Sequence, residues 1–158
     1  MDIPCAYREF VLPVSNVRAF RAFIIDGCNL MPKLLPHFIK HVYLVNRDGG
    51  PGTIQRVIFK SGGEDLYRVD TFDPENYAYK ATLSKGCMLH EKFDSVIYKL
   101  RFVASGGPDK CIVKMAIEYH MKEGRRLKEE DIERGQQRVI GFYQTMAAYL
   151  IANPDAYK

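Results

Sequence analysis

Three absences narrow the possibilities for this chain: it has no membrane-length apolar run, no block of basic residues and few cysteines. No stretch reaches the roughly 18 consecutive apolar residues of a membrane span, so we expect no membrane insertion. The 23 Lys and Arg residues against 19 Asp and Glu residues leave a formal net charge of only +4. Because these basic residues are scattered, we expect no obligatory nucleic-acid partner.

The four cysteines form neither a zinc-binding nor a disulfide pattern. No Cys-x-x-Cys pair occurs, and no histidine lies at zinc-finger spacing from Cys5, Cys28, Cys87 or Cys111. The N-terminus carries an acid and a proline where a signal peptide has basic and then continuous apolar residues. We therefore expect thiols in a reducing compartment, and a cytoplasmic protein.

Two histidines have a spacing that can bind metal on a helix. His37 and His41 are four residues apart, which places two side chains on one helix face. Pro36 and the strand-like residues after His41 argue against a helix there, and no third ligand is evident. We expect neither a bound metal nor a cofactor.

The stretch from Asn46 to Thr53 is rich in glycine but lacks the residues of a phosphate-binding loop. A Walker-type loop ends in Gly-Lys-Ser/Thr and opens a helix, whereas no lysine follows Gly52. The next residues, 53–59, are β-branched and aromatic and predict a strand. We therefore interpret Gly49, Gly50, Pro51 and Gly52 as a β-hairpin turn.

The rest of the chain indicates one α+β domain covering residues 1–158. At 158 residues and 47% hydrophobic composition, it can bury roughly 70% of its unfolded surface. A strand is predicted over 5–12 and a short helix from the N-cap Ser15 to Phe23. A second short helical piece is predicted to reach Leu35, followed by an antiparallel meander of about six strands between 41 and 121.

One long helix is predicted from Lys128 to Asn153. Acidic residues crowd its first turns, where the helix dipole favours them, and Pro154 marks its end. Intervals of three and four residues produce one apolar stripe, which is expected to face the sheet: Ile132, Gly135, Val139, Phe142 and Met146.

Several motifs in this order and spacing resemble those of the plant class-ten pathogenesis-related proteins, the family of the major birch pollen allergen. They are the segments 23–27 and 29–33, the glycine loop 46–53, Glu118-Tyr119-His120 and the closing segment 153–157. The resemblance covers essentially the whole chain. It implies a helix-grip fold in which a curved, seven-stranded antiparallel sheet wraps the long helix around a large internal apolar cavity.

Matched to that family, the ligand-contacting positions are mostly apolar, as a pocket for flat aromatic or steroid-like molecules requires. They fall on Phe23, Ile39, Val57, Phe59, Arg68, Tyr79, Gly135, Val139 and Phe142. Arg68 either pairs with an acidic group of the ligand or extends to the rim of the pocket. Inward tyrosines either contact a polar ligand group or are ordinary core aromatics.

The chain also departs from the family pattern. The family usually has glycine at Arg47, glutamate at Asn46 and lysine at Gln55. Losing the customary lysine weakens any phosphate or nucleic-acid role that the family implies.

The resemblance implies three functions. The first is a monomeric, intracellular, defence-related protein that binds hydrophobic small molecules such as flavonoids, cytokinins, other phenolics or alkaloids. The alternative is an enzyme of specialised metabolism that catalyses condensation, elimination or isomerisation. Its candidate catalytic residues are Tyr79, Arg68, Tyr119 and Lys114, although strand alternation places Lys114 on the outer face.

The third function is a ribonuclease. Glu91 and Tyr149 match two of the residues proposed for that activity in the family. The second glutamate position is Ala147 here, so one member of the acid–base set is absent.

Overall fold

The strands form a single antiparallel sheet in the order β1-β7-β6-β5-β4-β3-β2. The structure, a computed structural model, describes residues 3–46, 48–89 and 91–158. Its strands are β1 (Cys5–Leu12), β2 (Ile39–Leu44), β3 (Ile54–Phe59), β4 (Glu64–Asp73), β5 (Ala78–Gly86), β6 (Phe93–Ala104) and β7 (Cys111–Met121). The predicted strand followed by a six-stranded meander is confirmed.

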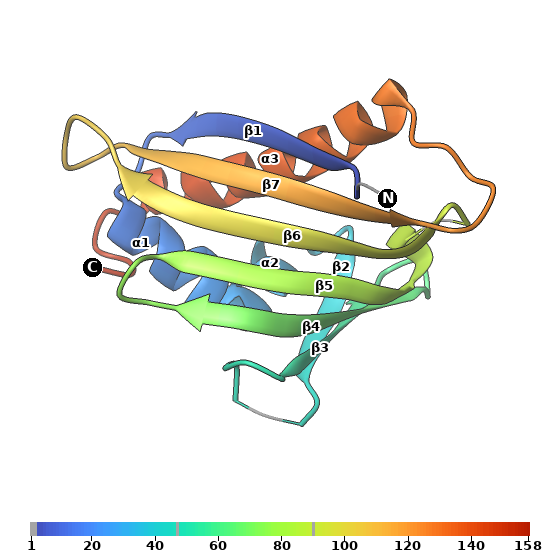
Figure 1. The fold of residues 1–158 in the computed structure, drawn as a ribbon. Helices are drawn as coiled ribbons and strands as arrows, with labels where there is room; N and C mark the ends of the chain where they lie inside the picture. Colours follow the sequence, from blue (N-terminus) through green and yellow to red (C-terminus); the bar gives the residue numbers. More distant parts are fainter. Residues whose placement is uncertain (1–2, 47, 90) are drawn as a thin grey trace.

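Helices cover one face of this sheet. Figure 1 shows the sheet in front and the helices behind it, with the long α3 (Glu129–Ala152) running behind β1, β7 and β6. Between β1 and β2 lie α1 (Asn16–Phe20), a π-helical turn η1 (Arg21–Ile25) and α2 (Gly27–Leu34), and a short 3-10 turn η2 (Cys87–Leu89) follows β5. The predicted helix-grip arrangement is confirmed.

The start of the first helical segment follows from local hydrogen bonding. The Ser15 side chain accepts a hydrogen bond from the backbone N–H of Arg18 at 3.2 Å, so Ser15 is the N-cap that the sequence predicts. The segment does not continue as one regular helix to Phe23, because α1 ends at Phe20 and η1 follows.

The first helix also holds the end of the last one. The Arg18 guanidinium donates to the carbonyl oxygens of Leu150, Asn153 and Ala156 at 2.9, 2.8 and 3.0 Å. These carbonyl groups lie in the last turn of α3 and in the turn that follows it, where regular helical hydrogen bonding ends. The bonds connect α1 to the C-terminal end of α3 and to the residues after it.

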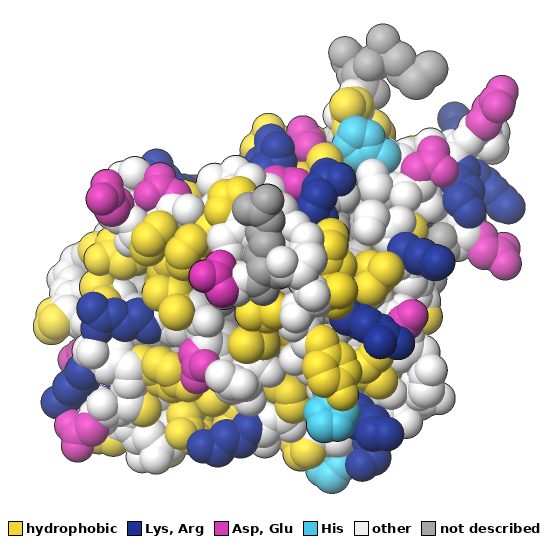
Figure 2. Space-filling view, turned by 90° about the horizontal axis from the view of Figure 1, so that it is seen from below, with side chains coloured by type: hydrophobic (Ala, Val, Ile, Leu, Met, Phe, Trp, Pro, Cys, Tyr) yellow, Lys and Arg dark blue, Asp and Glu magenta, His cyan; other side chains and the backbone are white. Residues whose placement is uncertain are grey.

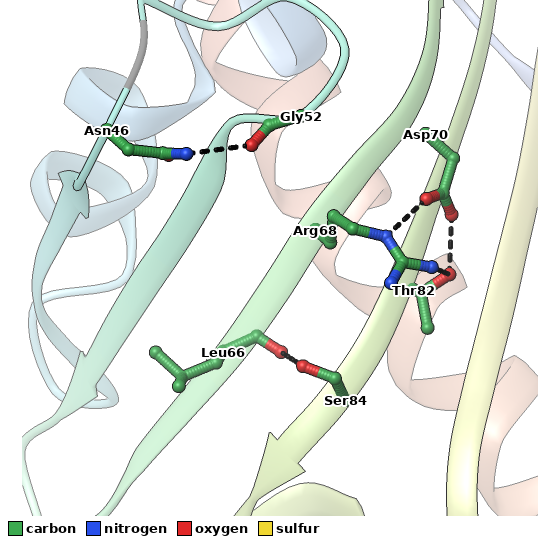
Figure 3. A network of polar contacts seen from close by, with 7 residues as sticks. All are labelled: Asn46, Gly52, Leu66, Arg68, Asp70, Thr82 and Ser84. Atoms are coloured by element: carbon green, nitrogen blue, oxygen red, sulfur yellow. Dashed lines mark hydrogen bonds and ion pairs between the residues drawn. The ribbon is translucent and has the colours of Figure 1, made fainter.

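The glycine loop between β2 and β3 is a hairpin connection. The Asn46 side chain donates to the Gly52 carbonyl oxygen at 3.1 Å, a contact drawn in Figure 3, and accepts from the Ile54 N–H at 2.8 Å. Gly49 and Gly52 have φ values of +123° and +90°, which favour glycine. The predicted hairpin turn is confirmed, while Arg47 lies outside the described residues.

The main core lies between the inner face of the sheet and the helices. Phe20 is fully buried and packs against the rings of Phe72, Tyr77 and Phe102, with centroids 5.6 to 6.0 Å apart. A second, smaller cluster joins Ile39, Val57 and Phe59 near α2. A cavity lies beside these clusters.

Candidate ligand-binding cavity

A cavity of about 140 Å³ lies between the sheet, α2 and α3. Its lining residues come from η1, α2, strands β2 to β6 and the middle of α3. Most are apolar or aromatic: Phe23, Ile24, Gly27, Cys28, Met31, Phe38, Ile39, Val42, Val57, Phe59, Ala81, Leu100, Val139, Phe142 and Tyr143. An apolar wall of this kind binds ligands chiefly through burial of their own apolar surface.

Polar groups interrupt this wall at a few positions. Gln55, Tyr67, Tyr79, Tyr98 and Arg138 line the same cavity. The Gln55 side chain is hydrogen-bonded to Tyr79, and Arg138 Nη2 donates to the Tyr98 hydroxyl oxygen at 3.3 Å. The rings of Tyr67 and Tyr98 lie 6.3 Å apart. The cavity is thus mostly apolar, and among the described residues its polar side chains are a few tyrosines, one glutamine and one arginine.

The cavity tyrosines remain protonated at neutral pH. Burial raises the pKa of the Tyr67, Tyr79, Tyr98 and Tyr143 hydroxyls above the ordinary value of 10.0, because a buried phenolate loses its hydration. The positive charge of Arg138 acts in the opposite direction on the pKa of Tyr98 and only partly offsets burial. These hydroxyls are therefore neutral hydrogen-bonding groups.

The comparison with known families decides where this chain belongs. Residues 8–153 match the Pathogenesis-related protein Bet v 1 family. The chain is a member of that family. The Major allergen Pru ar 1 of Prunus armeniaca is 39% identical over 154 residues, which cover 94% of each chain.

Solved structures share the architecture. The crystal structure of Ara h 8.0201 is similar with a TM-score of 0.86 and 25% identity, covering 96% of this chain and 99% of that one. Norcoclaurine synthase from Thalictrum flavum, solved with dopamine and hydroxybenzaldehyde, has a TM-score of 0.67 and 20% identity over 94% of this chain and 87% of its own. The second likeness shows the fold alone.

Most of the ligand-contacting positions implied by the Bet v 1 resemblance do lie on the cavity wall. Seven of the nine line it: Phe23, Ile39, Val57, Phe59, Tyr79, Val139 and Phe142. The structure thus brings together residues from η1, β2, β3, β5 and α3. Their role in binding stays a prediction.

Arg68 is an exception, and the prediction that it lies on the inner face is wrong. Its Nε donates to Asp70 Oδ1 at 2.7 Å and its Nη2 to the Thr82 hydroxyl at 3.3 Å, on the outer face of β4 and β5 (Figure 3). Its side chain is 52% exposed. Because Tyr67 and Val69 take the inner positions of β4, the alternation of the strand turns Arg68 outward.

Gly135 and Tyr119 lie next to each other, outside the cavity lining. A Cβ atom added to Gly135 would lie 3.5 Å from the Tyr119 hydroxyl oxygen. That hydroxyl is buried and has no hydrogen-bond partner in the described part of the chain, and burial raises its pKa to about 12. An added Cβ would thus be in ordinary contact with Tyr119, and Gly135 does not line the cavity.

Two other predicted groups also lie away from the cavity. Lys114 is on the outer face of β7, as alternation predicts, with its Nζ 3.9 Å from Glu9 Oε1. The residues of the glycine loop, Gly49 to Gly52, are absent from the cavity lining that the described residues form. Of the four catalytic candidates, only Tyr79 is on the cavity wall.

The structure does not bring the two ribonuclease candidates together. Glu91 is exposed and precedes Lys92, whose Nζ is 2.8 Å from Asp131 at the start of α3. Tyr149 lies 18 residues further along α3, which corresponds to roughly 27 Å at 1.5 Å per residue. An acid and a base separated in this way cannot flank one phosphorus atom.

Sequence reasoning missed Arg138, Tyr143, Gln55 and Tyr67 as wall residues. Arg138 and Tyr143 each lie beside the predicted stripe, next to Val139 and Phe142, so a wider helix face would have included them. Gln55 occupies a position where the family usually has lysine, and this departure marked it as unusual. Tyr67 is two residues from the apolar Val69 on the same strand, and this alternation could have placed Tyr67 on the inner face.

The described residues contain no group of three His, Cys, Asp or Glu side chains that could hold a metal ion. None of the helices in this part of the chain is long and apolar enough to cross a membrane.

Proposed function

We propose that this member of the Bet v 1 family binds a small, mostly apolar aromatic metabolite in the cavity. The observation that carries the proposal is the combination of an apolar wall with a few polar groups that face the same space. The apolar residues would supply affinity through burial, and Tyr79, Tyr98 and Gln55 would orient polar substituents. The family's description as pathogenesis-related supports a role in defence as part of this proposal.

The size of the cavity favours a one-ring ligand. An apolar protein cavity of about 150 Å³ binds benzene, whereas pockets for drug-sized molecules measure about 300–1,000 Å³. At about 140 Å³, the cavity is smaller than the large space that the family resemblance implies. Aromatic side chains line the cavity from α3, with Phe142 and Tyr143, and from the residue before β2, Phe38. A three-ring flavonoid would need these side chains to move.

The wall favours binding over acid–base catalysis. Among the described residues that line the cavity there is no lysine, histidine, aspartate or glutamate. Tyrosines whose pKa is raised by burial are poor bases at neutral pH. The enzyme alternative is supported by the fold shared with norcoclaurine synthase and by Tyr79, which is on the wall.

A cavity-filling variant tests the proposal with phenol as the probe. Val139→Phe introduces a ring into the cavity from α3, so phenol should no longer bind. Gln144→Phe is the matched control, because it adds the same ring at an exposed position of the same helix. We expect calorimetric titration to detect phenol binding to the wild type and to the control, and a higher Tm in the presence of phenol.

Two results would contradict this proposal. Undiminished phenol binding to a folded Val139→Phe protein would place the binding site elsewhere. No binding of any one-ring aromatic to the wild-type protein would remove the cavity as a ligand site. A new product formed only with native protein, and lost in Tyr79→Phe, would favour the enzyme alternative.

A further inference from the structure

Arg138 is the one charged side chain among the described residues that line the cavity. It projects from α3, where its residue is half-buried. No ion pair of Arg138 is found in the described part of the chain, and its hydrogen bond goes to a neutral tyrosine, Tyr98. A cation on an apolar wall is costly unless an opposite charge accompanies it.

The hydroxyl groups around Arg138 are able to complete an anion site. Tyr98 uses an oxygen lone pair to accept from Arg138, so its own hydrogen remains available for donation to a ligand. Tyr67, whose ring lies 6.3 Å from that of Tyr98, is also protonated because burial raises its pKa. A guanidinium group and two phenol hydroxyls can donate together to the two oxygens of a carboxylate.

One acidic side chain, that of Asp65, also acts on Tyr67 and Tyr98. Asp65 on β4 is fully buried, and its charge raises the pKa of both Tyr67 and Tyr98, while that of Arg138 lowers it. Asp65 does not line the cavity, whereas Arg138 does. A ligand therefore meets Arg138 on the cavity wall, whereas Asp65 acts on the two tyrosines from outside the lining.

We propose that the cavity selects a one-ring aromatic carboxylate, with the carboxylate at Arg138 and Tyr98 and the ring against the apolar wall. This inference rests on the proposed function and names the ligand class for that site. The ring would contact Leu100, Val139 and Phe142, which line the same cavity. The charge of Arg138 selects the carboxylate, and the cavity volume limits the ligand to about one ring.

The test compares benzoate with benzamide, which has the same ring and nearly the same shape but no charge. We expect the wild-type protein to bind benzoate about tenfold or more tightly than benzamide in calorimetric titrations at neutral pH. Arg138→Gln should remove most of that preference while leaving benzamide affinity nearly unchanged. Arg68→Gln is the matched control, because it removes the arginine that lies outside the cavity, and it should change neither affinity.

The outcomes separate this inference from the proposed function. Equal affinity for benzoate and benzamide in the wild type would overturn the carboxylate assignment and leave aromatic binding intact. Equal weakening of both ligands by Arg138→Gln would overturn it as well. Failure of both probes and of phenol to bind would overturn the two proposals together. The wild-type comparison needs no variant, so it stands even where Arg138→Gln fails to fold.

Discussion

The two faces of the same sheet have opposite chemistry. On β6, Tyr98, Leu100 and Phe102 point toward α3, whereas Lys99 and Arg101 point to the outer face. The outer face continues this pattern across strands, because Lys80 lies opposite Lys99 and Arg101 lies opposite Lys114. The inner face has tyrosines and apolar residues, and the one arginine among the described residues that shares the cavity with them, Arg138, comes from α3.

This difference shows where a charge needs a partner. Water screens the four outer cations, and Glu118 and Glu9 lie 3.4 and 3.9 Å from Lys99 and Lys114. On another side of the molecule, seen from below in Figure 2, basic and acidic side chains are also interspersed with exposed apolar ones. Arg138 in the cavity is half-buried, so water screens its charge less. A lone arginine there is therefore more informative about a ligand than four cations outside.

The largest expected effect is alkaline unfolding caused by the buried tyrosines. The folded protein keeps Tyr67, Tyr79, Tyr98, Tyr119 and Tyr143 protonated above pH 10.0, whereas the unfolded chain releases these protons near pH 10.0. Their contribution to stability is thus fully present below pH 10.0 and is lost as pH rises through the folded pKa values. We expect the free energy of unfolding to fall steeply above pH 10.0.

Ultraviolet absorbance of phenolate, recorded with circular dichroism, measures this effect. Phenolate from these five tyrosines, two of them buried and three half-buried on the cavity wall, should appear only as secondary structure is lost. If these five tyrosines titrated near pH 10.0 with the circular dichroism unchanged, their surroundings would not be as dry as the structure indicates.

A matched pair of valines on β6 should show the second-largest difference. Val96 is 4% exposed on the inner face, and Val103 is half-buried on the outer face. We expect Val96→Ala to lower the free energy of unfolding by about 2 kcal/mol and Val103→Ala by less than about 1 kcal/mol. Urea unfolding measures both values. Equal losses would mean that the outer face is packed as closely as the inner one.

The sequence was sufficient to predict the fold and the regular parts of the inner wall. Ser15, the turn clusters and the stripe on the last helix are local signals, and Tyr79 follows a regular alternation through Leu83. Arg68 was misplaced because the inner positions of β4 belong to Tyr67 and Val69, and register shifts flank this stretch after Leu66 and after Val69. Matching positions to a family does not show which face of a strand a side chain occupies.

Arg138 and the cavity volume depend on contacts that are remote in sequence. Arg138 and Tyr98 are 40 residues apart, and the chain contains no local pattern that joins them. A guanidinium group is ordinarily expected at the surface, so helix periodicity assigned the wall to apolar residues alone. The free volume depends on how rings from α2, β2 and α3 pack together, which no single segment determines.

The smallest expected effect concerns the like-charged pairs on the outer face. Directly opposite like charges destabilise a sheet, and Arg101 lies opposite Lys114 without an ion pair of its own in the described part of the chain. Arg101→Thr should therefore raise the free energy of unfolding by about 0.2–1 kcal/mol at low salt. Lys85→Thr on β5 is the control, because Leu66 lies opposite it. The gain from Arg101→Thr should shrink as added salt screens the repulsion, and a gain independent of salt would assign it to strand propensity instead of charge.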